Sequence, residues 1–241
     1  MVETCLKVEG VSKAIKKQTL IEDISLQIDK GNILALCGGN GAGKSTLLRI
    51  IAGIYRPTCG QVSINGLQWA KDRKAYAAQI GFMPDDYQFQ HGLTARETLT
   101  FWAAIRKIPE PAVTVDELLE LVGLEDKDKM IVTTFSKGMR QRLLFAQSLL
   151  AKPPLLIMDE PTNGLDPFWM NEFVSHIRRV REEGHTVIFS THQLEIAEQV
   201  ADYIVFMSGG HAVGEGSTSE ICERYGSLFG AFNYSLGLTK M

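Results

Sequence analysis

The chain has 241 residues, of which 45% are hydrophobic and 22% are charged, so it is long enough to bury a full apolar core. This composition excludes intrinsic disorder, collagen-like repeats and small disulfide-rich scaffolds. The formal net charge of −3 gives no electrostatic basis for wrapping duplex nucleic acid, so no nucleic-acid partner is expected.

The first part of the chain has the patterns of strands around a glycine-rich loop and a helix. Residues 20–28 alternate apolar and polar side chains, as a half-buried strand does. Residues 32–37 are almost continuously apolar, which is typical of a strand buried on both faces. A loop is expected at 38–43 and a helix at 44–53. Two further strands are expected at 61–65 and 79–83.

The middle of the chain has helical periodicity. Apolar residues recur at helical spacing in three segments, 94–107, 116–122 and 139–150. Pro109 and Pro111 are assigned to turns between these segments. We therefore predict a helical subdomain at about 85–150, helical throughout and inserted into the rest of the fold.

Strands and helices alternate in the last part of the chain. The predicted strands are 155–158 and 186–190, and the predicted helices are 168–183 and 194–200. Such alternation implies a mostly parallel sheet covered by helices on both faces. Residues 1–225 are expected to form one domain. The almost uncharged tail at 226–241 is expected to pack on this domain or to extend a contact between two chains.

The four cysteines lie far apart and form no Cys-x-x-Cys pair: Cys5, Cys37, Cys59 and Cys222. This scattering disfavours a zinc cluster or a disulfide framework and is typical of reduced thiols in the cytosol. No stretch approaches the roughly 20 consecutive apolar residues that cross a bilayer, and residues 1–10 do not resemble a secretory signal. Any role at a membrane is therefore expected to be carried out from outside the lipid.

A complete phosphate-binding motif, G-x-x-x-x-G-K-[ST], follows the strand at 32–37. Its residues are Gly38, Gly39, Asn40, Gly41, Ala42, Gly43, Lys44 and Ser45. Glycines let successive backbone N–H groups converge on an anion, and the next helix adds its positive N-terminal end, where Thr46 completes the predicted nucleotide-binding set. Lys44 is predicted to reach the β- and γ-phosphates, and Ser45 to ligate magnesium. The alternative is a chance glycine-rich turn, which the strand before the loop and the helix after it disfavour.

Two acidic residues end the apolar strand at 155–158. Asp159 is predicted to hold the magnesium shell, and Glu160 to polarise the water that attacks the nucleotide. The alternative is a solvated strand end with ordinary surface acids, but the upstream phosphate loop favours the nucleotide site.

Three more segments resemble the motifs of ABC transporter ATP-binding subunits of the exporter type, and they follow one another in the order that these motifs have in the family. Residues 135–143 resemble the signature motif, and residues 159–167 resemble the acidic strand that runs into the D-loop. Residues 190–192, Ser-Thr-His, resemble the switch-histidine motif. With the phosphate loop included, the resemblance extends from about residue 5 to about residue 225.

The resemblance implies an α/β fold with a P-loop NTPase core. In this fold a mostly parallel sheet is covered by helices, antiparallel strands lie at the N-terminus, and a helical subdomain is inserted. It also implies an ATPase that uses ATP and Mg²⁺ and powers a membrane exporter. A separate integral membrane permease would carry the cargo, and this subunit would lie peripherally on the cytoplasmic face of the membrane.

A head-to-tail dimer, of this chain with itself or with a homologous ATPase subunit, is implied as well. Ser136 and Gly138 of one chain would close over ATP held by Lys44 and Ser45 of the other, and Asp166 joins this nucleotide-binding set. The catalytic residues carried over from the family are Lys44, Glu160 and His192. Each motif also has an ordinary structural reading, such as a helix N-cap for the serine or a satisfied histidine at a strand end.

Two positions depart from the family's pattern. Ile15 stands where the family commonly stacks adenine on an aromatic ring, so weaker adenine binding is expected, with Tyr55 as a poorer alternative. Asp85 stands where glutamine usually follows Pro84; it is predicted to approach magnesium, directly or through a water, and is otherwise a loop acid. Residues 91–102 are the candidate permease contact, with ordinary subdomain packing as the alternative.

Two competing functions stay open. One is a regulatory ABC subunit that binds ATP with weak or no hydrolysis, which Ile15 and Asp85 favour and Glu160 and His192 disfavour. The other is a non-transport ABC ATPase acting on ribosomes or DNA, which the absence of a second cassette, a basic linker and long coiled coils disfavours.

Overall fold

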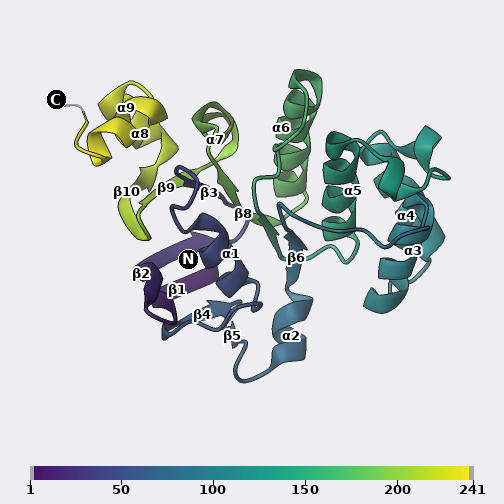
Figure 1. Ribbon diagram of the computed structural model, residues 1–241, viewed down its shortest axis with the longest axis horizontal. Coiled ribbons are helices and arrows are strands. Elements are labelled where there is room, and N and C mark those ends of the chain that lie inside the picture. Colours follow the sequence, from purple (N-terminus) through teal and green to yellow (C-terminus); the bar gives the residue numbers. More distant parts are fainter. Residues whose placement is uncertain (1–2, 239–241) are drawn as a thin grey trace.

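The computed structural model describes residues 3–238 and contains two sheets with helices packed around them (Figure 1). The smaller sheet has the strand order β2-β1-β4-β5, and its pairings are antiparallel. Its strands are β1 (Thr4–Ile15), β2 (Gln18–Asp29), β4 (Cys59–Ile64) and β5 (Leu67–Gln68). The strands predicted at 20–28 and 61–65 therefore belong to an N-terminal antiparallel sheet.

The larger sheet has the strand order β10-β9-β3-β8-β7-β6. Its strands are β3 (Ile33–Cys37), β6 (Ile80–Met83), β7 (Leu155–Met158), β8 (Thr186–Thr191), β9 (Tyr203–Ser208) and β10 (His211–Ser217). All neighbours pair in parallel except β9 and β10. The mostly parallel sheet expected from the alternation of strands and helices is confirmed.

Two hydrophobic cores lie on the two faces of this sheet. Successive side chains of a strand point to opposite faces, so β3 contributes Ile33, Ala35 and Cys37 to one core and Leu34 and Leu36 to the other. The second core lies between the two sheets and contains the apolar face of the helix that follows β3. Because both faces are covered, all five residues of β3 are buried, which explains its continuous apolar run.

Nine α-helices are described in residues 3–238. They are α1 (Lys44–Ile51), α2 (Arg73–Ala78), α3 (Ala95–Arg106), α4 (Pro111–Leu121), α5 (Lys137–Leu149), α6 (Pro167–Glu182), α7 (Leu194–Val200), α8 (Thr218–Tyr225) and α9 (Leu228–Ser235). Several begin at side-chain caps that are visible in the sequence: Thr94 and Glu97 form a capping box at α3, and Ser136 caps α5.

The chain between the paired strands β6 and β7 forms α3, α4 and α5, which gather at one end of the molecule (Figure 1). The expectation that residues 85–150 are helical throughout was wrong, because residues 84–94 form a loop and residues 122–136 contain only short 3₁₀ turns. Pro111 was also misplaced in a turn. It is the first residue of α4, where its fixed φ suits the helix and its missing N–H is not needed.

The last two helices pack on the chain's own larger sheet. In α9, Leu228 and Ala231 are buried, and the ring of Phe232 lies 5.3 Å from that of Phe206 in β9. The carboxylate of Glu198 in α7 accepts a hydrogen bond from the backbone N–H of Leu228 at 3.1 Å. Residues 226–238 of the predicted tail thus pack against this chain, and residues 239–241 lie outside the described residues. Among residues 3–238, no helix combines the length and the apolar character needed to cross a bilayer.

Candidate nucleotide site

The loop at 38–43 joins β3 to α1 in a conformation that needs glycine. Gly41 and Gly43 have φ of +78° and +100°, values that side chains other than glycine rarely adopt. A Cβ on Gly43 would lie 2.5 Å from Cγ2 of Ile21, and one on Gly38 would collide with the carbonyl oxygen of Met207. Glycine therefore lets β2 and β9 close against the loop and leaves the backbone curled for an anion.

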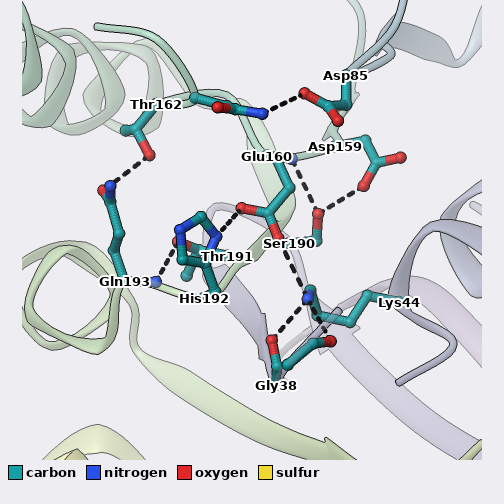
Figure 2. A network of polar contacts seen from close by, with 12 residues as sticks. Gly38, Lys44, Asp85, Asp159, Glu160, Thr162, Ser190, Thr191, His192 and Gln193 are labelled. Carbon is teal, nitrogen blue, oxygen red and sulfur yellow. Dashed lines mark hydrogen bonds and ion pairs between the residues drawn. The ribbon is translucent and has the colours of Figure 1, made fainter. Parts of the chain in front are cut away.

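Lys44 is the first residue of α1 and is only 5% exposed. Its Nζ donates to the carbonyl oxygens of Gly38 at 2.6 Å and Gly39 at 3.2 Å, and lies 3.2 Å from Oε1 of Glu160 (Figure 2). A buried ammonium needs such partners because leaving it unpaired is costly. The side chain is thus held inside the loop, where phosphate oxygens can take the place of these acceptors.

Asp159 follows β7 and is fully buried. Its Oδ1 accepts hydrogen bonds from Oγ of Ser45 at 2.9 Å and from Oγ of Ser190 at 2.7 Å. Its Oδ2 is buried and, within residues 3–238, has no hydrogen-bond partner. A buried carboxylate oxygen without a partner, next to a serine hydroxyl, is a fitting part of a magnesium shell.

The fit to magnesium depends on other oxygens as well. Within the described part of the chain, no group of three or more His, Cys, Asp or Glu side chains is arranged to hold a metal ion. Magnesium commonly keeps several waters and binds substrate phosphates in addition to one or two protein oxygens. Ser45 and Asp159 are therefore sufficient as protein ligands only together with a nucleotide.

Glu160 lies between Lys44 and His192. Its Oε2 is 2.8 Å from Nδ1 of His192, whose side chain is 51% exposed, and its Oε1 faces Lys44 (Figure 2). Its backbone has φ of +47°, an unfavourable conformation for a residue with a Cβ. Two hydrogen bonds hold this conformation, because the backbone N–H donates to Oγ of Ser190 at 2.9 Å and the carbonyl accepts from the N–H of Asn163 at 3.0 Å.

A local hydrogen bond shapes the segment after β8, and a second one ties this segment to the turn after β7. The backbone N–H of Gln193 donates to Oγ1 of Thr191 at 2.9 Å, and Oγ1 of Thr162 donates to Oε1 of Gln193 at 3.0 Å (Figure 2). Asp85 lies at the edge of this network and accepts a hydrogen bond from Nδ2 of Asn163 at 2.9 Å. In residues 3–238 no hydrogen bond joins Asp85 to Ser45, so its contact with magnesium stays a prediction.

Ser136 and Asp166 take no part in this hydrogen-bond network, and Gly138 lies beside the carbonyl oxygen of Gly164 at its border. Ser136 is exposed and caps α5 by accepting from the N–H of Met139 at 3.2 Å. Asp166 is exposed and caps α6 through the N–H of Trp169 at 2.9 Å. Within the described residues, no hydrogen bond or ion pair connects Ser136 or Asp166 with the phosphate loop. One chain therefore does not bring the two predicted halves of the nucleotide site together.

Ile15 ends β1 and is 47% exposed in the turn that leads to β2. β2 continues from this turn to Ile21, which borders Gly43, so the turn leads directly into a strand that touches the phosphate loop. Of the remaining predicted nucleotide-binding residues, Asn40 is exposed on the loop and Thr46 is half-buried in α1. The predicted stacking role of Ile15 is compatible with its exposure and stays a prediction.

A cavity of about 600 Å³ lies between the loop at 84–91 and α5. Asp85, His91 and Gln141 are among the residues that line it. The predicted permease segment, 91–102, begins at this cavity and continues into α3, where Leu99 is buried. This segment therefore has both an accessible part and a part that packs in the core.

Sequence reasoning missed the roles of Ser190 and Asn163. Ser190 belongs to the Ser-Thr-His segment, but its contacts with Asp159 and the backbone of Glu160 were not foreseen. One signal was available, because the carboxyl ends of two neighbouring parallel strands meet at the same edge of a sheet. The hydrogen bond of Asn163 to Asp85 joins two loops 78 residues apart and left no such signal.

Cys37 ends β3 beneath the phosphate loop and is completely buried. Burial raises the pKa of its thiol to about 12. The thiol is therefore neutral at physiological pH and fills space in the core instead of acting as a nucleophile.

Comparison with known proteins gives consistent results. The sequence matches the family described as ABC transporter over residues 21–163. It is 35% identical over 223 residues to the linearmycin resistance ATP-binding protein LnrL of Bacillus subtilis (strain 168), covering 92% of this chain and 72% of the relative. It is 40% identical over 226 residues to the sulfate/thiosulfate import ATP-binding protein CysA of Synechocystis sp. (strain ATCC 27184 / PCC 6803 / Kazusa), covering 92% of this chain and 63% of the relative. A solved structure described as an ATP binding subunit of an ABC transporter has a TM-score of 0.89 at 31% identity, covering 96% of this chain and 99% of that chain.

Proposed function

Because the chain belongs to the ABC transporter family of ATP-binding subunits, with the P-loop NTPase fold, we propose that it hydrolyses ATP to drive a separate permease chain, in the direction of export. One observation supports hydrolysis most directly. The carboxylate of Glu160 lies between Lys44 at 3.2 Å and His192 at 2.8 Å, at the phosphate loop. A carboxylate held at this position is placed to accept a hydrogen bond from the water that attacks the nucleotide.

In the proposed mechanism, Lys44 exchanges partners when ATP binds. Its Nζ gives up the carbonyl oxygens of Gly38 and Gly39 and the carboxylate of Glu160 for phosphate oxygens. The loop N–H groups and the N-terminal end of α1 add further positive charge. Glu160 is then released from Lys44 and is free to accept a hydrogen bond from the attacking water.

Ser45 and Asp159 are the residues that would hold Mg²⁺, through the serine hydroxyl and the unpartnered Oδ2. When bound, the ion would neutralise charge that develops on the phosphate oxygens. Ser190 keeps the other oxygen of Asp159 engaged, so the carboxylate presents one free oxygen in a defined direction.

His192 is proposed to orient Glu160 through the 2.8 Å contact of its Nδ1. Its other ring nitrogen is then available for the γ-phosphate. The ring is about half exposed, so it can change position when a nucleotide or a second chain arrives. His192 would therefore make the position of the Glu160 carboxylate depend on whether a nucleotide or a second chain is bound.

A head-to-tail dimer is proposed because Ser136 is exposed and, within residues 3–238, makes no hydrogen bond or ion pair with the phosphate loop of its own chain. Ser136 and Gly138 stand at the N-terminal end of α5, a helix of 13 residues whose positive end suits an anion. In the dimer they would contact ATP bound by Lys44 and Ser45 of the partner chain. The same reasoning applies to a homodimer and to a dimer with a homologous subunit.

Export is proposed from the resemblance of residues 135–143 and 159–167 to exporter motifs, and the resistance named for LnrL supports it. The import named for CysA makes an importer the competing outcome. The loop of Asp85 and residues 91–102 are the proposed permease contact, and Asp85 and His91 line the cavity of about 600 Å³. The subunit would act peripherally, at the cytoplasmic face of the membrane.

The proposed ATPase activity is tested with three proteins: the wild type, Glu160→Gln and Lys44→Ala. Glu160→Gln is expected to bind ATP but to hydrolyse it at least ~100-fold more slowly, because the amide cannot accept a proton from water. Lys44→Ala is expected to lose ATP affinity in calorimetry. Wild-type hydrolysis that is unaffected by Glu160→Gln contradicts the proposal. Wild-type binding without any hydrolysis indicates the regulatory alternative instead.

A further inference from the structure

We propose that Asp85 is a positioning residue that acts through Asn163, and that it aligns the turn at 160–164 with the catalytic and signature residues. This inference rests on the proposed ATPase function and assigns Asp85 a role other than metal ligand. Asp85 is placed for this role by its hydrogen bond at 2.9 Å to the Asn163 amide.

The two partners are brought together by the sheet. Asp85 lies in the loop after β6, and Asn163 lies in the turn after β7, and these strands are parallel neighbours. The bond is partly buried, so solvent does not replace it freely. The chemistry of the pair is also matched, because an ionised Asp85 can only accept while the amide of Asn163 donates.

The turn at 160–164, which Asp85 contacts through Asn163, begins at Glu160. The backbone N–H of Asn163 donates to the carbonyl of Glu160 at 3.0 Å, and the buried Thr162 donates to Gln193 at 3.0 Å. Glu160 itself has φ of +47°, a strained conformation that persists only when its surroundings hold it. Asn163 is therefore one of the residues that hold the catalytic carboxylate in place.

The other side of the turn packs on the start of α5. A Cβ on Gly138 would lie 3.0 Å from the carbonyl oxygen of Gly164, and a Cβ on Gly164 would lie 2.6 Å from Cδ of Lys137. The residue next to Asn163 thus touches the signature segment directly. Asp85 is thus linked through this turn to two functional segments that it does not contact directly: Glu160 and the N-terminal end of α5.

The test uses four variants in the otherwise wild-type chain. Asp85→Ala is expected to lower kcat about tenfold with less than about twofold change in the KM for ATP, because alignment is lost and nucleotide binding is not. Asp85→Asn keeps an acceptor for Asn163 and is expected to retain most activity. Asn163→Asp places two carboxylates face to face and is expected to be the poorest variant. The exchange Asp85→Asn with Asn163→Asp restores a donor and an acceptor and is expected to return kcat to within about twofold of wild type.

A pH profile distinguishes alignment from a general structural effect. In Asn163→Asp, acidification lets one carboxyl keep a proton and donate to the other, so kcat relative to wild type is expected to rise toward pH ~5. The exchanged pair does not need a protonated carboxyl, because the new amide donates to the new carboxylate, so its kcat should follow the wild-type pH profile. Asp86→Ala is the matched control: it removes a neighbouring exposed acid of the same loop and should leave kcat unchanged.

A second readout does not need hydrolysis. Trp169 lies in the first turn of α6, shortly after the turn at 160–164. The guanidinium of Arg142 lies 3.7 Å from its ring centre. With Trp69 and Trp102 replaced by phenylalanine, its fluorescence should change in Asp85→Ala and in Asn163→Asp, and return with the exchanged pair.

Three outcomes overturn the inference: an Asp85→Ala chain that behaves like Asp86→Ala, an exchanged pair that fails to recover, or a loss in Asp85→Ala that excess magnesium restores. The last result would identify Asp85 as a metal ligand. Failure of the proposed function is distinguishable, since a wild-type chain that neither binds nor hydrolyses ATP contradicts that function while the fluorescence pattern still supports the contact.

Discussion

Ser190→Ala is the most informative substitution outside the phosphate loop. The Ser190 hydroxyl is fully buried and makes two hydrogen bonds, donating to the Asp159 carboxylate at 2.7 Å and accepting from the backbone N–H of Glu160 at 2.9 Å. Alanine removes both at once. The Glu160 N–H is then left without its acceptor in a residue already strained at φ +47°.

The expected magnitude follows from these two bonds. A hydrogen bond to a charged group contributes about 1.5–3 kcal/mol and a neutral one about 0.5–1.5 kcal/mol, so Ser190→Ala should lower the free energy of unfolding by about 3 kcal/mol. For a chain of this size, 1 kcal/mol corresponds to roughly 2–4 °C in Tm. A fall in Tm of about 6–12 °C is therefore expected.

Urea unfolding of the wild type, Ser190→Ala and Ser148→Ala measures this effect. Ser148→Ala is the control, because Ser148 is also buried but its hydroxyl makes a single neutral hydrogen bond, to the carbonyl of Phe145 at 2.7 Å. Its loss should cost only about 1 kcal/mol. If Ser190→Ala costs no more than Ser148→Ala, then Ser190 does not hold Asp159 and Glu160 in the way described.

Three other predictions concern separate parts of the site and the core. Gly43→Ala should destabilise the chain by about 1–3 kcal/mol and abolish ATP binding, because its Cβ would lie 2.5 Å from Ile21 at φ +100°. Gly39→Ala is the control, since its Cβ would meet open space and should not destabilise the chain. Equal unfolding midpoints of the two variants would refute this prediction. Ile15→Tyr should tighten ATP binding about threefold in calorimetry by adding a ring to stack on adenine, and a large loss of affinity would mean that Ile15 is not at the adenine. Burial lowers the pKa of His176 below its ordinary value of 6.5. The unfolded chain therefore binds this proton more tightly than the folded chain does, so the free energy of unfolding decreases as the pH falls below 6.5. His176→Gln should therefore flatten the pH dependence of the unfolding free energy between pH ~7 and ~5, and an unchanged slope would contradict this.

The phosphate loop and the acid pair were predictable because their signals are local. The motif ending at Ser45 specifies a conformation within eight consecutive residues, and Asp159 follows a strand that its apolar run identifies. Their contact, 2.9 Å between Ser45 and the Asp159 carboxylate, also fits the sheet, since the phosphate loop that leads to Ser45 leaves β3, and Asp159 leaves β7, at the same edge of one parallel sheet. Local pattern and sheet geometry together were sufficient for this part of the site.

Contacts between loops were not predictable from one sequence. The Asp85–Asn163 bond depends on how two irregular segments are shaped, which no periodicity records. Pro111 was placed in a turn because proline breaks helices in their interior, whereas its position at the first residue of α4 is favourable. The packing of the C-terminal helix α9 was left open because its burial depends on a sheet face formed by distant strands, where Phe232 contacts Phe206 of β9.

The central claim is that ATP is enclosed between two chains, and cysteine cross-linking across the seam tests it most directly. In a Glu160→Gln chain with Cys59 and Cys222 replaced by serine, one preparation carries Asn40→Cys on the phosphate loop and the other Ser136→Cys on the signature segment, both at exposed positions. Mixed with ATP, Mg²⁺ and a mild oxidant, the two preparations should form disulfide-linked dimers that neither forms alone and that require ATP, since a disulfide needs Cα atoms within about 7 Å. No ATP-dependent cross-link in the mixture would contradict a dimer of this chain with itself, and a disulfide formed within one chain carrying both substitutions would contradict the account as a whole.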